Sequence, residues 1–165
     1  MLLSFTIGNF RSFKENKTFS MRAASIQELK EFVREDCGES ILPVTAIYGA
    51  NSSGKSNLLT AMLAMRSVLL SSIKTNPTED LDTDIFKLDE AYSQKPTHFE
   101  VVCTIESKIY RYGFEYNSKK ITKEWLYDAT KGKEKLLFTR NENGIGVDYK
   151  FAEGNGKEEI TTDIE

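Results

Sequence analysis

The sequence predicts an α+β fold of the mixed α/β kind, in which a strand–loop–helix core stands beside an antiparallel β-meander. Three patterns carry this prediction. An apolar run ends at Gly49, a helical apolar stripe follows it, and strand-length segments joined by short polar turns fill residues 99–151. The chain has 165 residues, enough for one domain with a core and too few for two large ones.

The bulk composition is that of an ordinary globular protein, with 39% apolar and 28% charged residues. The formal net charge is −3, so the average charge gives no support for binding to nucleic acid. The longest apolar stretches are too short to cross a bilayer, and the N-terminus lacks the features of a signal peptide. Cys37 and Cys103 have no CxxC spacing and are expected to be reduced. We therefore expect a cytoplasmic protein with no membrane partner.

The N-terminal segment alternates apolar and polar residues twice. Residues 3–7 and 18–21 are expected to pair as antiparallel strands. Residues 25–35 place Ile26, Leu29 and Val33 on one helical stripe, with Ser25 and Glu28 at capping-box positions. This segment is predicted to be a short surface helix or an ordered loop.

The core elements follow. Residues 43–48 form a continuous apolar-leaning run that predicts a central strand covered on both faces. Residues 55–72 predict a helix packed into a core. Its apolar stripe consists of Leu58, Leu59, Met62, Met65, Leu69 and Ile73, with Leu63 and Leu70 beside it.

The second half of the chain predicts a meander. Its expected strands are residues 99–105, 109–116, 121–129, 135–140 and 145–151. In the second of these, Tyr110, Tyr112, Phe114 and Tyr116 share one face. We expect one lobe over residues 1–165, divided into a core at 1–73, a loop at 74–98, the meander at 99–151 and a flexible tail at 152–165.

One motif carries chemistry. Gly49, Gly54, Lys55 and Ser56 satisfy the pattern GxxxxGK[ST], between an expected buried strand and a helix. This is the phosphate-binding P-loop. The glycines let the backbone turn and approach phosphates closely, and the amides with the helix N-terminus form an anion-binding nest. Lys55 would reach the β- and γ-phosphates, and the Ser56 hydroxyl would bind Mg²⁺.

The loop and the N-terminus together resemble one ATPase branch. The run from Gly49 to Leu59, with Asn51 and Lys55-Ser56-Asn57, is similar to the P-loop of ATP-binding-cassette-type ATPases of the RecF, SMC and OLD-nuclease branch. Phe5 to Lys14, with Asn9-Phe10-Arg11-Ser12-Phe13, resembles the opening strand and turn of that branch. The named motifs cover residues 1–72. Many proteins with this opening are bacterial AAA-family ATPases linked to phage defence.

The resemblance implies that this chain is the N-terminal lobe of a P-loop NTPase that uses ATP and Mg²⁺. It implies a site lined by residues of the P-loop and of the N-terminal turn: Gly49, Ala50, Asn51, Ser52, Ser53, Gly54, Lys55, Ser56, Asn57, Arg11 and Ser12. From its residue type alone, Arg11 could equally be a surface arginine stacked on Phe10 or Phe13. The implied partners are a C-terminal lobe, a second ATPase head, and a nuclease or other effector.

The carboxylates needed for hydrolysis are not recognisable in the sequence. Asp128 and Asp148 end apolar runs, but no glutamate follows either of them. No Leu-Ser-Gly-Gly-like signature occurs, and the lone His98 is expected to be structural. In the related ATPases these parts lie in a second lobe. We therefore expect residues 1–165 to bind nucleotide weakly and to turn over little.

Two further alternatives stay open. Basic residues at 119, 120, 123, 131, 133, 135 and 140 are expected to gather at one end of the meander, as a DNA contact or as a solvated rim. The nucleotide could drive an effector, or it could be a structural or sensing ligand with little hydrolysis. A small P-loop kinase is disfavoured because such kinases use a parallel sheet rather than a meander.

Overall fold

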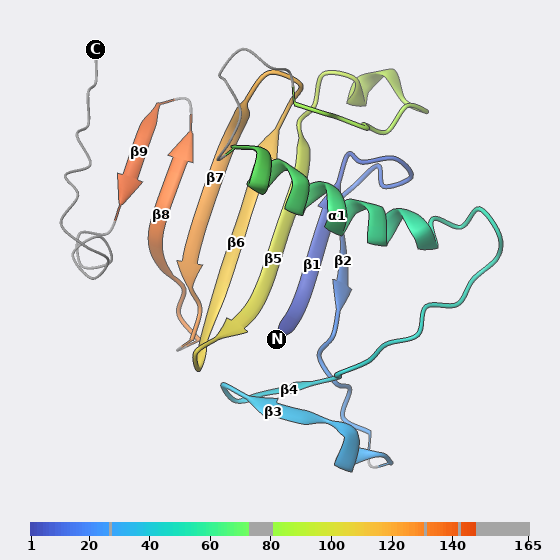
Figure 1. Cartoon of the computed structure of the whole chain (residues 1–165), viewed down its shortest axis with the longest axis vertical. Helices are drawn as coiled ribbons and strands as arrows, with labels where there is room; N and C mark the ends of the chain where they lie inside the picture. The colour runs from blue at the N-terminus through green and yellow to red at the C-terminus, as the bar shows by residue number, and fades with distance from the viewer. Residues whose placement is uncertain (27, 73–80, 131, 142, 148–165) are drawn as a thin grey trace.

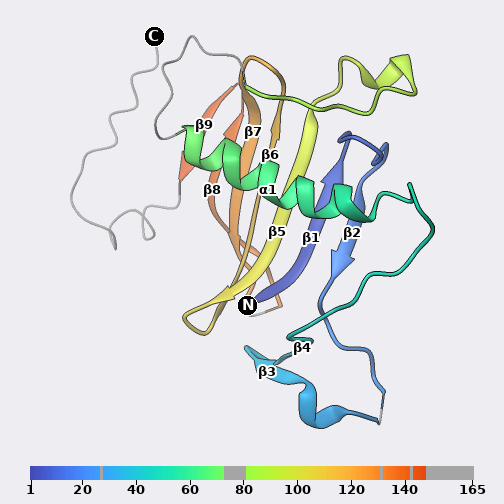
Figure 2. The same cartoon turned by 45° about the vertical axis from the view of Figure 1, so that its right-hand side comes forward.

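The computed structural model describes residues 1–26, 28–72, 81–130, 132–141 and 143–147. Its main element is a seven-stranded antiparallel sheet with the order β2-β1-β5-β6-β7-β8-β9 (Figure 1). The strands are β1 (Leu2–Gly8), β2 (Lys17–Ser20), β5 (Thr97–Ile105), β6 (Lys108–Tyr116), β7 (Ile121–Asp128), β8 (Lys135–Asn141) and β9 (Gly144–Val147). The one α-helix of the described residues, α1 (Lys55–Ser72), lies across one face of this sheet, as both views show (Figure 2).

The predicted N-terminal pair and the meander are confirmed. β1 and β2 pair antiparallel with Phe5 opposite Phe19, and β1 then pairs with β5, so the N-terminal strands extend the meander's sheet. Four successive hairpins join β5 to β9. The expected last strand is seen only as Gly144–Val147, and residues 148–165 lie outside the described part, as does Ile73 at the expected helix end.

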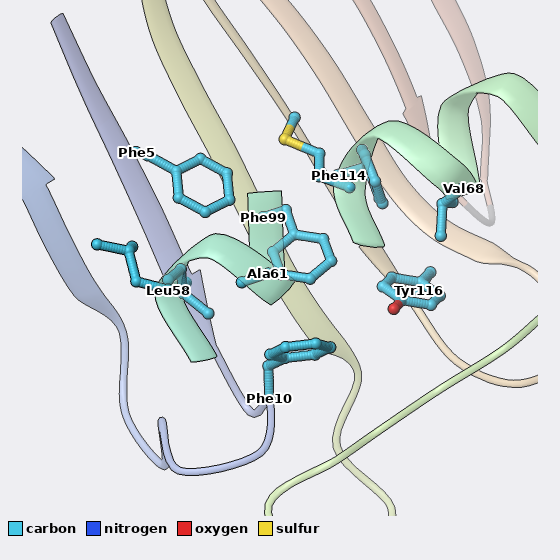
Figure 3. Packing of buried hydrophobic residues seen from close by; sticks show 10 residues of the cluster. Phe5, Phe10, Leu58, Ala61, Val68, Phe99, Phe114 and Tyr116 are labelled. Carbon is cyan, nitrogen blue, oxygen red and sulfur yellow. The ribbon is translucent and has the colours of Figure 1, made fainter. Parts of the chain in front are cut away.

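The core lies between α1 and the sheet, and it is mainly aromatic. Phe99 is fully buried at its centre, with ring centroids 5.4 to 6.0 Å from those of Phe5, Phe10, Phe114 and Tyr116 (Figure 3). The helix contributes four buried residues to this cluster: Leu58, Ala61, Met65 and Val68. Each fully buried large side chain contributes roughly 1.5–3 kcal/mol through removal of apolar area from water.

The predicted helical stripe is correct in part. Leu58 and Met65 are buried, and Met62 and Leu69 pack against the cluster. Leu59 was expected in the stripe, but it is 60% exposed, and its neighbours Leu63 and Leu70 also lie on the outer side of α1. One sheet face covers only one side of a helix, so a stripe this wide leaves residues uncovered.

The prediction of a central strand at residues 43–48 is wrong for this structure. The segment is irregular, and Val44 and Tyr48 are 79% and 89% exposed. A buried parallel strand needs hydrogen-bonded neighbours and cover on both faces. No described strand pairs with these residues, so their apolar side chains remain at the surface.

The predicted helix at residues 25–35 is also wrong. The described part of this segment holds a short 3-10 turn, η1 (Lys30–Phe32), and then a separate hairpin of β3 (Arg34–Asp36) and β4 (Glu39–Ile41). Cys37 and Gly38 join the two strands, with φ angles of 54° and 77°. Two consecutive positive φ angles give a tight turn whose twist matches the flanking strands. The ordered-loop alternative describes residues 28–33 better than a helix does.

Candidate nucleotide-binding site

The P-loop curls from Gly49 into the first turn of α1. Ser52 and Gly54 have φ angles of 63° and 88°, which bend the chain back on itself. The Ser53 amide donates to the Ala50 carbonyl at 3.3 Å, and the Asn57 amide donates to the Gly54 carbonyl at 3.0 Å. The stretch is therefore not extended, and it leads directly into the N-terminus of an 18-residue helix. This arrangement is a ready-made anion site.

Lys55 lies at the centre of the curl. Its ammonium donates to the Gly49 carbonyl at 2.7 Å and to the Ala50 carbonyl at 2.5 Å, and it lies 3.4 Å from the Ser53 hydroxyl. The positive charge thus lies against the loop backbone, and the Lys55 side chain is half-buried. The first turn of α1 carries no acidic side chain, so nothing there competes with an anion for the helix N-terminus.

Both loop glycines lie close to a serine hydroxyl, and Gly54 also has a positive φ. A Cβ at Gly49 would lie 2.9 Å from the Ser53 hydroxyl oxygen. A Cβ at Gly54 would lie 2.7 Å from the Ser12 hydroxyl oxygen, and its backbone adopts a left-handed conformation that L side chains rarely take. The absence of side chains at these two positions keeps the loop compact and its backbone accessible.

Ser12 is brought to the P-loop by the turn between β1 and β2. The Asn57 side-chain amide donates a 2.9 Å hydrogen bond to the Ser12 hydroxyl. A cavity of about 520 Å³ opens between this turn and the loop. It is lined by Ser12, Phe13, Lys14, Glu15, Lys17, Ser52 and Ser53. The structure therefore places Ser12, one of the residues expected at the nucleotide, beside Gly54 and Asn57.

Unlike Ser12, which meets the P-loop, Arg11 pairs with Asp84. Its Nε donates to the Asp84 carboxylate at 2.6 Å, and its guanidinium carbon lies 5.8 Å from the centre of the Phe10 ring. The stacking of Arg11 on Phe10, one of the two alternatives for this residue, is thus present, and Asp84 is its acidic partner. Asp84 lies 73 residues further along the chain in a segment expected to be a loop, and no local pattern in the sequence links it to Arg11.

The same region holds a second ion pair at the turn. The Lys14 ammonium lies 2.8 Å from the Asp89 carboxylate. The hydrogen bond between them raises the pKa of Lys14 and lowers that of Asp89. Asp89 also caps the short η2 turn (Glu90–Tyr92) by accepting from the Ala91 amide. Residues 84–92 are thus tied to the N-terminal turn at two charged contacts.

The remaining expected nucleotide residues belong to the loop itself. Asn51, Ser52, Ser53 and Ser56 are exposed, and Ala50 supplies the carbonyl already described. Ser56 offers one hydroxyl at the start of α1, the position from which a P-loop residue binds Mg²⁺. The residues present fit an ATP–Mg²⁺ complex in their charge and donor chemistry: an ammonium, a helix N-terminus, two glycines that leave the backbone open, and an exposed serine.

The hydrolytic carboxylates are not found in the described residues. The Asp128 carboxylate accepts from the Thr130 amide and hydroxyl at 2.9 and 2.6 Å, so it caps a turn. Asp148 lies outside the described part of the chain. Among described residues, no group of three or more His, Cys, Asp or Glu is placed to hold a metal ion. His98 pairs with Glu115 and lies 5.4 Å from the Trp125 ring, in keeping with a structural role.

The expectation that the basic residues gather at one end of the meander is wrong. Lys119 and Lys120 lie in the turn before β7, and Lys133 lies in the turn after it, so the length of one strand separates them. Consecutive hairpin turns of a meander necessarily fall at opposite ends of the sheet. Lys123 and Arg140 are moreover paired with Glu115 and Glu124, each at 2.9 Å, and Lys131 lies outside the described residues.

These features define a P-loop nucleotide-binding domain. A comparison with family models agrees: residues 44–164 match the family described as "AAA domain, putative AbiEii toxin, Type IV TA system". The chain belongs to this family and is an AAA-family P-loop ATPase domain, a class that generally uses ATP and Mg²⁺. No curated protein matches the chain. Within the described residues, no helix combines the length and apolarity needed to cross a membrane.

Proposed function

We propose that this chain is the ATP-binding lobe of a larger ATPase of the RecF, SMC and OLD-like branch. The observation that carries the proposal is the position of Lys55, whose ammonium is enclosed by the loop carbonyls at the N-terminus of α1. ATP phosphates would lie on the amides of residues 50–57, with Lys55 at the β- and γ-phosphates. Bound Mg²⁺ would neutralise phosphate charge, and Ser56 would supply its protein oxygen.

A second lobe is supported by uncovered apolar surface. Val44, Ile47 and Tyr48 precede the P-loop, and Leu59 and Leu63 lie on the outer side of α1; all five are exposed. Large apolar residues left exposed before the P-loop and along α1 are candidates for burial by a partner domain. In the proposed full-length protein a C-terminal lobe covers this surface and brings the hydrolytic carboxylates. A second ATPase head would then close each site in an ATP-dependent dimer.

The family description names a putative toxin, which supports a role in a defence or toxin system over a metabolic one. A nuclease or other effector, and DNA as its target, fit that role. The alternative is that nucleotide acts as a sensing ligand with little hydrolysis. It is favoured by the absence, among the described residues, of a carboxylate cluster that could complete a catalytic metal site.

The test is nucleotide binding by the 165-residue chain. Titration of a fluorescent ATP analogue with Mg²⁺ should show weak binding, and Lys55→Ala should weaken it roughly 10- to 100-fold, the loss of one charge-assisted contact. Lys108→Ala, an exposed lysine at the start of β6, is the matched control and should bind like wild type. Equal affinities for wild type and Lys55→Ala would refute the proposed site.

The rate of ATP hydrolysis distinguishes an isolated ATP-binding lobe from a complete enzyme. The chain alone should hydrolyse little or no ATP, because the carboxylates that position Mg²⁺ and water are expected in the second lobe. A robust Mg²⁺-dependent rate that Lys55→Ala abolishes would show that the second lobe is not needed.

A further inference from the structure

Asn9 is a buried polar residue with an unusual set of partners. It is 4% exposed and has a left-handed backbone, with φ of 45°. Its side-chain oxygen accepts from the Phe86 amide at 3.2 Å. Its side-chain nitrogen donates to the carbonyls of Tyr92 and Lys95 at 3.1 and 2.7 Å. One side chain therefore fastens the end of β1 to a segment almost 80 residues away.

The backbone of Asn9 is held as well. Its carbonyl accepts from the Thr97 hydroxyl at 3.0 Å, and Thr97 is fully buried at the start of β5. Asparagine tolerates the left-handed region better than most residues, but the conformation persists only where the surroundings hold it. The four contacts from Phe86, Tyr92, Lys95 and Thr97 are those surroundings.

Two more residues of the turn, Arg11 and Lys14, are bonded to the same distant segment. Arg11, also left-handed with φ of 48°, donates its amide to the Asp84 carbonyl at 2.7 Å, in addition to the side-chain pair between the same residues. Lys14 reaches Asp89 at 2.8 Å and lies 5.3 Å from the centre of the Tyr92 ring. We call residues 84–97 the bracket, because they hold the turn of residues 9–14 from outside.

Ser12 stands at the tip of the bracketed turn. Its hydroxyl accepts from the Asn57 side chain, and its oxygen would lie only 2.7 Å from a Cβ added to Gly54. Within the described part of the chain, Ser12 forms no hydrogen bond with the bracket, and its hydroxyl is bonded to Asn57. The position of its hydroxyl against the P-loop is therefore set by its neighbours in the turn, which the bracket fixes.

We propose that Asn9 is a positioning residue for the nucleotide site: anchored to the bracket, it fixes the turn that presses Ser12 against Gly54 and Asn57. The inference rests on the proposed function, since it assumes that nucleotide binds at the P-loop. Its consequence is that affinity for ATP depends on a residue whose side chain bonds to the bracket, and on the bracket itself.

A double-mutant cycle tests this coupling. Affinity for a fluorescent ATP analogue with Mg²⁺ is measured for the wild-type chain, Asn9→Ala, Ser12→Ala and the double variant, at a temperature where circular dichroism shows all four folded. Each single variant should bind roughly 5- to 10-fold more weakly, the effect of one lost or displaced hydrogen bond. If Asn9 acts through Ser12, the double variant should bind within about twofold of the weaker single variant.

The control is a variant that destabilises without touching the turn. Leu137→Ala removes a buried side chain from β8, four strands from β1 in the sheet, and should lower the melting temperature while keeping wild-type affinity. Should Asn9→Ala fail to fold, Asn9→Gly replaces it. Glycine adopts the left-handed backbone at φ of 45° without strain and loses every side-chain bond to the bracket, so it should still bind more weakly than wild type.

The outcomes separate the two proposals. Wild-type affinity in folded Asn9→Ala, or losses that multiply fully in the double variant, would overturn the positioning role and leave the P-loop assignment intact. Failure of the wild-type chain itself to bind nucleotide would instead overturn the proposed function.

Discussion

The side chain of Asn57, in the first turn of α1, donates a 2.9 Å hydrogen bond to the hydroxyl of Ser12, 45 residues earlier in the chain. This contact joins the two motifs on which the resemblance to ATPases rests. The N-terminal turn and the P-loop are separate in sequence, yet they form adjoining walls of one cavity. The site is thus built by two segments whose relative position depends on the fold of the whole sheet.

The first prediction concerns Gly54. Gly54→Ala places a methyl group 2.7 Å from the Ser12 hydroxyl oxygen on a backbone with φ of 88°. We expect a loss of roughly 1–2 kcal/mol in unfolding free energy and severe loss of nucleotide binding. Urea denaturation and nucleotide titration measure the two effects.

Gly132→Ala is the matched control for Gly54. Its φ is 70°, but nothing lies within 4 Å of the added Cβ. It should lose some stability through strain while keeping wild-type affinity. Equal binding by Gly54→Ala and Gly132→Ala would contradict the assigned role of Gly54.

The second prediction concerns Gly113, in the middle of β6. An added Cβ would lie 2.6 Å from the Trp125 ring and 2.8 Å from the Phe99 carbonyl oxygen. The Phe99 carbonyl oxygen belongs to the backbone of a paired strand and cannot move without disturbing the sheet. Gly113→Ala should therefore lower the unfolding free energy by about 1–3 kcal/mol, the usual range for overpacking. Gly146→Ala, in β9, meets only a methyl group of Thr139 at 3.2 Å and should change stability far less when both are unfolded in urea.

The third prediction tests the aromatic core. Phe99→Ala should destabilise the domain by about 3–5 kcal/mol, because Phe99 is fully buried and in ring contact with four other aromatic residues. Leu63→Ala, on the outer side of α1, should cost less than about 0.5 kcal/mol since Leu63 is 65% exposed. Comparable losses in thermal melts of the two variants would show that the core is not where the structure places it.

The fourth prediction is a pH dependence. The Glu115 carboxylate lies 3.5 Å from His98 Nδ1 and 2.9 Å from the Lys123 ammonium. Hydrogen bonding to His98, and then to Lys123, lowers the pKa of Glu115 to about 2 from an ordinary 4.5. A folded-state pKa below the unfolded value stabilises the protein above pH 4.5, and this contribution is lost as the pH falls from about 4.5 towards 2.

The measurement is urea unfolding of Glu115→Gln beside wild type. At pH 7 the variant should be less stable by about 1–3 kcal/mol, and the difference should shrink steadily below pH 4.5. Glu106→Gln, in the exposed turn between β5 and β6, serves as control and should track wild type. If the difference in unfolding free energy between Glu115→Gln and wild type stayed constant from pH 7 to pH 3, the lowered pKa of Glu115 would not contribute to stability.

Much of the fold follows from local patterns that the sequence carries directly. Alternation with a period of two predicts β1, β2 and the meander, because side chains of a strand point to opposite faces. The spacing of Gly49, Gly54, Lys55 and Ser56 predicts a phosphate loop, because each residue type has a role that its neighbours in the chain suffice to define. Tyr112, Phe114 and Tyr116 share the core face for the same local reason.

The predictions that were wrong concerned features that depend on contacts between residues distant in sequence. An apolar run such as residues 43–48 is a buried strand only where other strands flank it, and the described sheet offers none. The lysines at residues 119, 120 and 133 belong to opposite sheet ends, which only the path of β7 reveals.

By itself, then, the sequence determined the chemistry of the phosphate loop and the strands that alternate around it. The tertiary structure alone decided that Asn9 and Arg11 are held by residues 84–97, and that Ser12 meets Asn57. The physical reason is the separation in sequence between interacting groups. Periodicity and turn chemistry act over a few residues, whereas these hydrogen bonds join groups 45 to 86 positions apart that only the folded sheet brings together.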